Sequence, residues 1–253
     1  MPLHAWTLLL LLTLSITNIK AQEAPIQLDR PDQTECAYIV PKNYIQLENG
    51  FTFEKISASA GSVAYPSTLW KYGVNEKFEL RLITELVSVK ENNLKQTGLL
   101  PITAGFKANL CQEKGIVPMI SFIGHITTAN WGSKKFHTRY VAPAFRFTMQ
   151  HTLSDKISLG YNLGAEWDGE SPAPTWIYTL TTGLSITEKL GSYIEVYGFA
   201  PQDGKTDHRF DGGITYLLSH NTILDISGGS HLNNVTPGGY IALGFSFRFA
   251  VKK

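Results

Sequence analysis

The sequence predicts an all-β protein, a transmembrane antiparallel β-barrel of about 12 strands with short periplasmic turns and long extracellular loops. Three observations predict this fold. An apolar N-terminal stretch indicates export, strands of about ten residues alternate apolar and polar side chains, and the connections alternate in length. No later apolar run approaches the roughly 18 residues of a membrane-spanning helix, so any crossing of a membrane must be made by strands.

The N-terminal stretch has the features of a signal peptide. Residues 6–16 are apolar, small and polar residues follow, and we expect cleavage after Ala21. The stretch is shorter than the roughly 20 residues that span a bilayer. We therefore predict a signal peptide at residues 1–21, a periplasmic N-terminal segment at residues 22–43, and a barrel in the outer membrane of a Gram-negative bacterium at residues 44–253.

The predicted strands alternate with a period of two. In residues 78–86 leucines alternate with Glu79, Arg81 and Glu85, which places apolar and charged side chains on opposite faces of one strand. Such runs match the roughly 9 to 11 residues of a tilted membrane strand. The same division runs through residues 100–110, 145–150, 157–167 and 241–249. Three strands carry apolar residues on both faces, and their lumen side is left open: residues 117–127, 193–199 and 210–218.

The connections between strands alternate between short and long along the whole chain. We expect the short ones at residues 75–76, 112–115, 153–156, 187–189 and 219–221. We expect the long ones at residues 57–64, 87–97, 128–138, 168–174, 200–207 and 232–238. This alternation is typical of a membrane barrel, and it places both chain ends in the periplasm.

Aromatic residues gather near the predicted strand ends. Trp167 and Trp176 flank one long loop and share the apolar parity of their strands, as an aromatic belt at a membrane interface requires. The alternative for any single residue is an ordinary aromatic side chain of a strand edge or core. The predicted interface residues are Trp70, Tyr72, Trp131, Tyr140, Trp167, Trp176 and Tyr240.

Charged residues of polar parity are predicted to line the barrel interior. Interior charges are tolerated only when they are paired or in contact with water. They therefore form either a salt-bridge network that fixes the lumen or the lining of a watery pore. The predicted lumen residues are Glu48, Glu54, Glu79, Arg81, Glu85, Lys107, Arg146, Glu166 and Arg248.

The segment before the first strand is too polar to face lipid. It carries Asp29, Arg30, Asp32 and Glu35 around a proline. We hypothesise that it packs into or under the barrel as a plug, with Arg30 paired to an acid of the interior. The alternative is a solvated periplasmic tail.

Charge and cysteine content narrow the choice of partners. Loss of Lys20 with the signal removes one of 22 basic side chains and leaves the charge balanced against 21 acidic ones, which disfavours a nucleic-acid partner. The histidines and the two cysteines show no metal-ligand spacing, so we expect neither a metal nor a cofactor. Whether Cys36 and Cys111 form a disulfide is left open.

The sequence does not predict an enzyme. Some outer-membrane barrels are lipid hydrolases, and His125 and His151 lie on strands near Ser121 and Ser154. Neither pair sits in a recognisable nucleophile motif, so hydrolysis stays a minor alternative.

Several segments of the chain resemble one known family. They are residues 28–35 (LDRPDQTE), 40–42 (VPK), 69–74 (LWKYGV), 78–81 (FELR) and 245–249 (FSFRF). Together they are similar to the family of outer-membrane transporters named for the MetA pathway of phenol degradation. The resemblance implies an outer-membrane barrel that acts as a channel or transporter for small solutes, with aromatic or hydrophobic molecules as the class suggested by the family name.

The partners expected from this resemblance are outer-membrane lipids, a small-molecule solute and the barrel-assembly machinery. The last strand, which ends near Phe249, resembles the signal that this machinery recognises, although four more residues follow. Three alternatives remain: a closed-lumen structural or surface-interaction barrel, a lipid hydrolase, and a soluble secreted β-barrel binder.

Overall fold

The structure is a computed structural model that describes residues 24–57, 59–92, 94–232 and 238–251. The predicted signal peptide lies outside the described residues. In the part of the chain that is described, no helix is long and apolar enough to cross a membrane. A short 3-10 turn, η1 (Lys134–Phe136), lies between β6 and β7.

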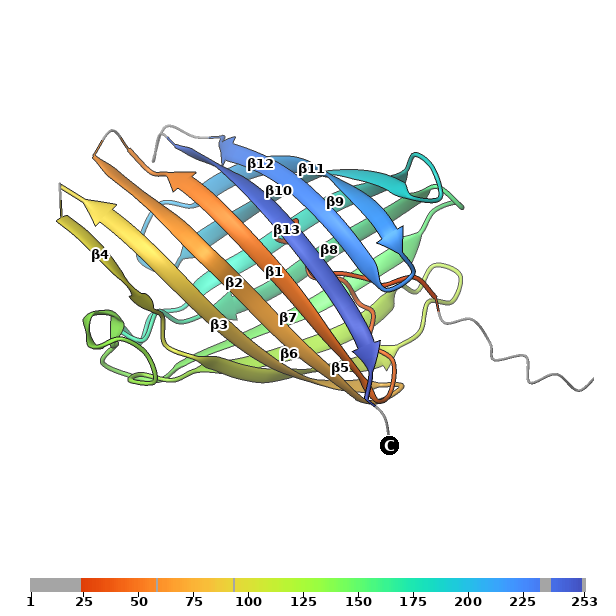
Figure 1. Cartoon of the computed structure of the whole chain (residues 1–253), viewed down its shortest axis with the longest axis horizontal. Helices are drawn as coiled ribbons and strands as arrows, with labels where there is room; N and C mark the ends of the chain where they lie inside the picture. The colour runs from red at the N-terminus through yellow and green to blue at the C-terminus, as the bar shows by residue number, and fades with distance from the viewer. Residues whose placement is uncertain (1–23, 58, 93, 233–237, 252–253) are drawn as a thin grey trace, which may run out of the picture.

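The described chain folds into thirteen antiparallel strand segments that form one closed barrel (Figure 1). Their bounds are β1 Tyr44–Lys55, β2 Ala60–Asn75, β3 Phe78–Glu91, β4 Leu94–Leu99, β5 Thr103–Cys111, β6 Met119–Thr127, β7 Ala142–Thr152, β8 Ile157–Glu166, β9 Thr175–Ser185, β10 Leu190–Pro201, β11 Asp207–Ser219, β12 Thr222–His231 and β13 Gly239–Ala250. The pairing of β1 with β13 over their full length closes the barrel.

Two of these segments share one place in the wall. β5 pairs with the first half of β3, and β4 pairs with the second half. The thirteen segments therefore occupy twelve positions around the barrel. The predicted fold, an antiparallel barrel of about twelve strands, is confirmed.

The barrel is apolar outside and polar inside, because consecutive side chains of a strand point to opposite faces. Leu163 and Ile194 expose 56% and 72% of their surface, whereas the adjacent Asn162 and Glu195 expose 0% and 3%. Moving a side chain such as leucine from water into an apolar medium gains about 1.5–3 kcal/mol. The outer surface is thus suited to lipid.

The structure also shows which side chains face the lumen on the three strands for which the sequence left this open. On β6 the lumen side holds Ser121 and Ile123, and on β10 it holds Tyr193, Glu195 and Tyr197, all of them buried. The large lipid-facing residues of β11 are Phe210, Ile214, Tyr216 and Leu218. The parity was ambiguous because the lumen itself encloses tyrosines and an isoleucine.

Both ends of the described part of the chain lie at the end of the barrel where β1 begins and β13 ends, hereafter the terminal end. The short connections lie at the same end, and the longer connections lie at the opposite, loop end (Figure 1). The longest described ones cover residues 128–141 and 167–174. This is the predicted alternation, and part of one long connection, residues 233–237, lies outside the described residues.

Two of the predicted long loops were wrong. Residues 60–64 belong to β2 and pair with both β1 and β3, so the connection is confined to residues 56–59. Most of residues 87–97 form a hairpin of β3 and β4. At this end of the barrel the strands extend beyond the expected bounds, because pairing satisfies the backbone groups of these residues.

Candidate functional site

The N-terminal segment, residues 24–43, enters the barrel from the terminal end and crosses the lumen without regular secondary structure (Figure 1). Its entry is fixed by the Ile26 N–H, which donates to the His220 carbonyl at 2.9 Å, and its exit by the Asn43 N–H, which donates to the Gly73 carbonyl at 2.8 Å. Between these points Asp29, Ala37 and Val40 are buried.

An irregular buried segment must find partners for its backbone donors outside a helix or sheet. Here side chains of the barrel wall accept them. The N–H of Asp29 donates to Glu48 at 2.9 Å, and that of Val40 donates to Glu79 at 2.8 Å. The remaining contacts of this kind are Gln33 to Glu195 and Glu35 to Asn162, both at 2.7 Å, and Ala37 to Gln150 at 3.4 Å.

The Asp29 carboxylate is the centre of the contacts on one side of the lumen. One oxygen accepts from Lys71 of β2 and Arg81 of β3, both at 2.9 Å, and the other accepts from Lys107 of β5 at 2.6 Å. Lys71 also pairs with Glu48 at 2.5 Å, and Arg81 with Glu79 at 3.1 Å. We call these residues (Asp29, Glu48, Lys71, Glu79, Arg81 and Lys107) the Asp29 cluster.

The charges of the Asp29 cluster are mutually dependent. Burial opposes ionisation of Asp29, but Lys107, Lys71 and Arg81 outweigh it and hold the pKa of this carboxyl well below its ordinary value. Removing one partner of a buried ion pair typically costs about 3–5 kcal/mol, because the other charge is left uncompensated. The cluster therefore fixes the segment to β1, β2, β3 and β5.

Arg81 and Arg146 continue these contacts toward Glu35. Arg81 pairs with Glu35 at 2.5 Å and its Nε–H donates to Nε2 of His125 at 3.1 Å. Arg146 donates to the carbonyl of Gln33 at 3.0 Å and lies 3.9 Å from both Glu35 and Glu166. The segment is thereby also bound to β7.

The opposite side of the lumen is acidic. Arg30 pairs with Asp225 of β12 at 3.1 Å, an interior acid of the kind hypothesised for it. Gly50 and Gly244, which pair across β1 and β13, leave the room that this ion pair fills, since a Cβ at either position would collide with Arg30 or Asp225.

Beside this pair three carboxyl groups approach one another: Asp32 of the segment, Glu195 of β10 and Asp211 of β11. Glu195 accepts from the Thr34 hydroxyl at 2.5 Å, and Asp211 from the Tyr240 hydroxyl at 2.5 Å. Burial, together with the nearby Glu195 and Asp211, raises the pKa of Asp32 well above its ordinary value. We call Asp32, Glu195 and Asp211 the carboxyl group cluster.

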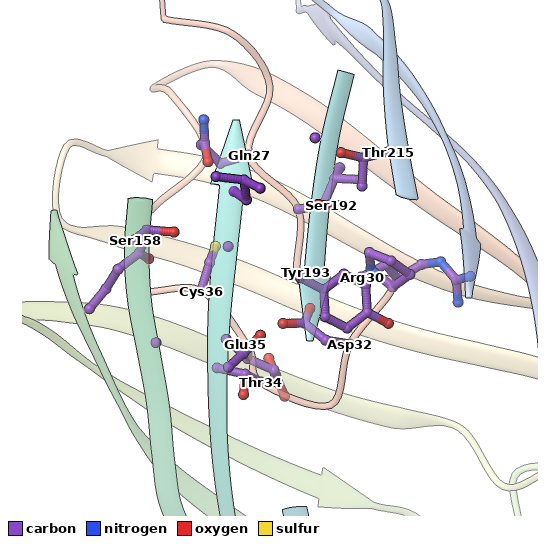
Figure 2. A pocket seen from close by; sticks show the side chains of 18 of the residues that line it. Gln27, Arg30, Asp32, Thr34, Glu35, Cys36, Ser158, Ser192, Tyr193 and Thr215 are labelled. Carbon is purple, nitrogen blue, oxygen red and sulfur yellow. The ribbon is translucent and has the colours of Figure 1, made fainter. Parts of the chain in front are cut away.

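A cavity of about 250 Å³ lies between the segment and the wall of β8 to β11 (Figure 2). Asp32 and Tyr193 line it together with Ser158, Ser192 and Thr215. A second cavity, of about 350 Å³, shares Gln27, Leu28, Arg30, Ser185, Gly191 and Thr215 with it and continues toward the terminal end. The segment therefore leaves part of the lumen open along this wall.

The nine predicted lumen residues all lie on the inner face. Glu48, Glu79, Arg81, Lys107 and Arg248 are buried, whereas Glu54, Glu85, Arg146 and Glu166 are half-buried. Glu54 lies 3.8 Å from Arg209, and Arg248 donates to the side-chain oxygen of Asn221 at 2.8 Å. The four candidate plug residues (Asp29, Arg30, Asp32 and Glu35) all lie in the lumen.

Sequence reasoning missed Lys71, Asp225, Glu195 and Asp211. Two of them carried a usable signal, because Lys71 stands between Trp70 and Tyr72, and Asp225 between Leu224 and Ile226, which is the same alternation as elsewhere. Glu195 and Asp211 lie on the strands whose facing was ambiguous.

Six of the seven predicted interface aromatics lie on the outer surface or in loops. Trp70, Trp131, Tyr140 and Trp176 are exposed, and Tyr72 and Trp167 are half-buried. Tyr240 was wrongly placed: its hydroxyl donates to Asp211 inside the lumen. It has the inward parity of Ala242 on β13, and its position at a strand end concealed this.

The residues considered for hydrolysis, for a disulfide and for metal binding are placed as follows. Ser121 donates to the Ala37 carbonyl at 2.6 Å, and a ring nitrogen of His151 lies 3.3 Å from the Tyr161 hydroxyl. Cys36 and Cys111 are free thiols, and burial beside Asp29 raises the pKa of Cys36 to about 12. Within the described residues, no three His, Cys, Asp or Glu side chains are grouped so as to hold a metal ion.

The fold is similar to those of solved outer-membrane channels and porins. The COG4313 outer membrane channel from Pseudomonas putida F1 matches with a TM-score of 0.66 and 10% identity, over 88% of this chain and 100% of that one. The NanC porin matches with a TM-score of 0.58 and 8% identity, over 79% and 98%. The KdgM porin, in complex with disordered oligogalacturonate, matches with a TM-score of 0.55 and 10% identity, over 80% and 99%.

No curated protein matches the sequence significantly. The family model described as "Putative MetA-pathway of phenol degradation" matches residues 28–249. The match includes most of the segment that enters the lumen and nearly the whole barrel, so the family covers both parts of the candidate site. The chain belongs to this family, as the resemblance predicted.

Proposed function

We propose that this protein is a passive channel for small solutes in the outer membrane. It is proposed to be exported through its N-terminal signal and inserted by the barrel-assembly machinery. The observation that carries the proposal is the cavity beside the segment, because together with the second cavity it continues toward the terminal end past the charged side chains of the lumen. Family membership and the likeness of the fold to channels and porins support it.

The solute class follows from the lining and the family. Tyr193, Tyr197 and Tyr240 place aromatic surface on the lumen side of β10 and β13. Aromatic rings stack on one another with a gain of about 0.5–1.5 kcal/mol beyond area burial. Small aromatic or hydrophobic solutes with a polar group are therefore the proposed cargo.

The segment is proposed to act as a fixed constriction. Deletion of residues 22–41 removes Asp29 and the other plug residues but keeps β1 complete. We expect a severalfold higher conductance of the purified variant in planar bilayers, together with faster swelling of liposomes in 2-phenylethanol. A lower melting temperature should accompany both, since the Asp29 cluster is lost.

The competing proposal is a closed-lumen structural or surface-interaction barrel, which the dense Asp29 cluster favours. Wild-type protein that inserts into bilayers yet neither conducts nor passes any solute would support that role. Unchanged conductance and thermal stability after the deletion would contradict the role given to the segment. Arg146→Ala provides a second check, since a change in ion selectivity is expected only of an open lumen.

A further inference from the structure

The carboxyl group cluster lacks a cationic partner. Glu195 accepts from the Gln33 N–H at 2.7 Å and the Thr34 hydroxyl at 2.5 Å, and Asp211 accepts from Tyr240. Across the described ranges, no ion pair within 4.0 Å connects Asp32, Glu195 or Asp211 with a lysine, arginine or histidine. The Asp29 cluster, by contrast, pairs every carboxylate with a base.

One buried polar atom at this place, the Tyr193 hydroxyl, has no hydrogen-bond partner. Asp211 lies within hydrogen-bond reach of Glu195, so these two carboxyl groups can share a proton. Tyr193 exposes 8% of its surface and Asp211 3%. Tyr193 is within electrostatic reach of all three carboxyl groups, and it lies beside Asp32 in the cavity wall (Figure 2). Glu195 and Asp211 are buried next to these two residues and do not line the cavity themselves. Because buried polar atoms are nearly always bonded in folded proteins, the Tyr193 hydroxyl marks a place where a ligand can bond.

The chemistry of the unpartnered groups defines this ligand. Carboxylate oxygens and a phenol oxygen accept hydrogen bonds from N–H groups, and the rings of Tyr193, Tyr197 and Tyr240 attract cations to their faces. A metal ion is not favoured, since the described residues hold no group of three suitable ligands. The cavity of about 250 Å³ has the volume of several water molecules, at about 30 Å³ each, and so admits a small organic molecule.

We infer that Asp32 and the Tyr193 hydroxyl, with the carboxyl groups of Glu195 and Asp211 behind them, form a binding site for small organic ammonium ions on the open side of the lumen. The inference deepens the proposed channel function and rests on it only for the supply of solute to the site. An ammonium group there donates to Asp32 and to the Tyr193 hydroxyl, which line the cavity, and its positive charge favours the ionised form of the neighbouring carboxyl groups.

Binding can be measured without permeation. Isothermal titration calorimetry of the full chain in detergent compares phenethylammonium with 2-phenylethanol, two probes of the same shape that differ in charge. We expect the cation to bind about tenfold or more tightly than the alcohol. Equal binding of the two probes, or no binding of the cation, overturns the inference.

Variants locate the site. Glu195→Gln and Asp211→Asn keep the side-chain shape and should each weaken binding of phenethylammonium about tenfold. Asp207→Asn is the matched control on β11, because Asp207 is already paired with Arg209 and His231; it should bind like the wild type. If Asp207→Asn weakens the binding of phenethylammonium as much as the two variants do, the proposed site is wrong. If a variant does not fold, the comparison of phenethylammonium with 2-phenylethanol on the wild-type protein still tests the inference.

Failure of this site and failure of the channel give different results. Conductance and liposome swelling without selective binding of the cation reject the ammonium site and leave the channel. Selective binding of the cation without conductance or swelling rejects the channel and leaves the site.

Discussion

At the scale of single residues, the two sides of the lumen differ in how their charges are compensated. Asp29 is held by three bases at 2.6–2.9 Å, whereas Asp32 faces two other acids. These two aspartates stand three positions apart in the same segment. Substitution of each should therefore have opposite consequences for the docking of the segment.

Asp29→Asn removes the charge that compensates Lys71, Arg81 and Lys107. We expect docking of the segment to weaken by roughly 3–5 kcal/mol, the usual cost of breaking a buried ion pair. Cys36 serves as a probe, since its N–H donates to Asp29 at 3.0 Å and its thiol is free. In a Cys111→Ser background, the rate at which a maleimide labels Cys36 should rise at least about tenfold. Asp155→Asn, in an exposed turn, is the control, and an equal rise there would refute the prediction.

Asp32 should make docking depend on pH. Because its pKa in the folded protein is raised, the stability contributed by neutral Asp32 is fully present below its ordinary value of 3.8 and is lost as the pH rises through the raised pKa. The titratable groups that face it are Glu195 and Asp211 from the wall, with Tyr193 beside them. Labelling of Cys36 should thus become faster with rising pH than intrinsic thiol reactivity explains.

Asp32→Asn should abolish that additional pH dependence, because the amide stays neutral. The ratio of labelling rates of the two proteins at each pH cancels the reactivity of the thiol itself. A ratio that stays constant on the alkaline side would show that ionisation of Asp32 does not influence docking.

At the scale of elements, the period of two predicted most strands and their lumen face, because lipid on one side and a polar lumen on the other impose alternation. Glu48, Glu79, Arg81 and Lys107 followed from it. Alternation could not predict the facing of β10, where Tyr193 and Tyr197 lie on the same inner face as Glu195. Nor could it reveal the path of residues 24–43, since an irregular segment has no period and its contacts join residues more than a hundred positions apart.

The outward face of β10 supplies a prediction at this scale. Ile194, 72% exposed and near the middle of the strand, points away from Glu195. Ile194→Lys should destabilise the barrel in lipid vesicles by roughly 2–4 kcal/mol, as charges near the bilayer midplane do. Urea titration in vesicles measures the loss. Ile116→Lys, at a turn position that is 92% exposed, should have little effect. Equal stability of the two variants would argue against a lipid-facing β10.

At the scale of the whole molecule, the apolar exterior of the closed barrel favours the proposed membrane channel over the alternative of a soluble secreted binder. Leu80, Leu163 and Ile241 are among the large apolar side chains that cover the outside. We expect the protein to fractionate with outer membranes, to resist extraction by high salt and carbonate, and to require detergent for solubility. Recovery of folded protein in the soluble fraction without detergent would favour the binder.

The manner in which the wall holds residues 24–43 has a consequence for the evolution of this family. Glu48, Glu79, Glu195 and Asn162 accept from main-chain N–H groups, which every amino acid except proline provides. Recognition of the main chain at these positions is therefore independent of the side chains, whereas Asp29 and Glu35 also bind the wall through their carboxylates. Selection can change residue 33 to any amino acid except proline, whereas residue 40 is buried and has to keep an apolar side chain of similar size. The constriction keeps its path so long as the wall acceptors and Asp29 stay in place.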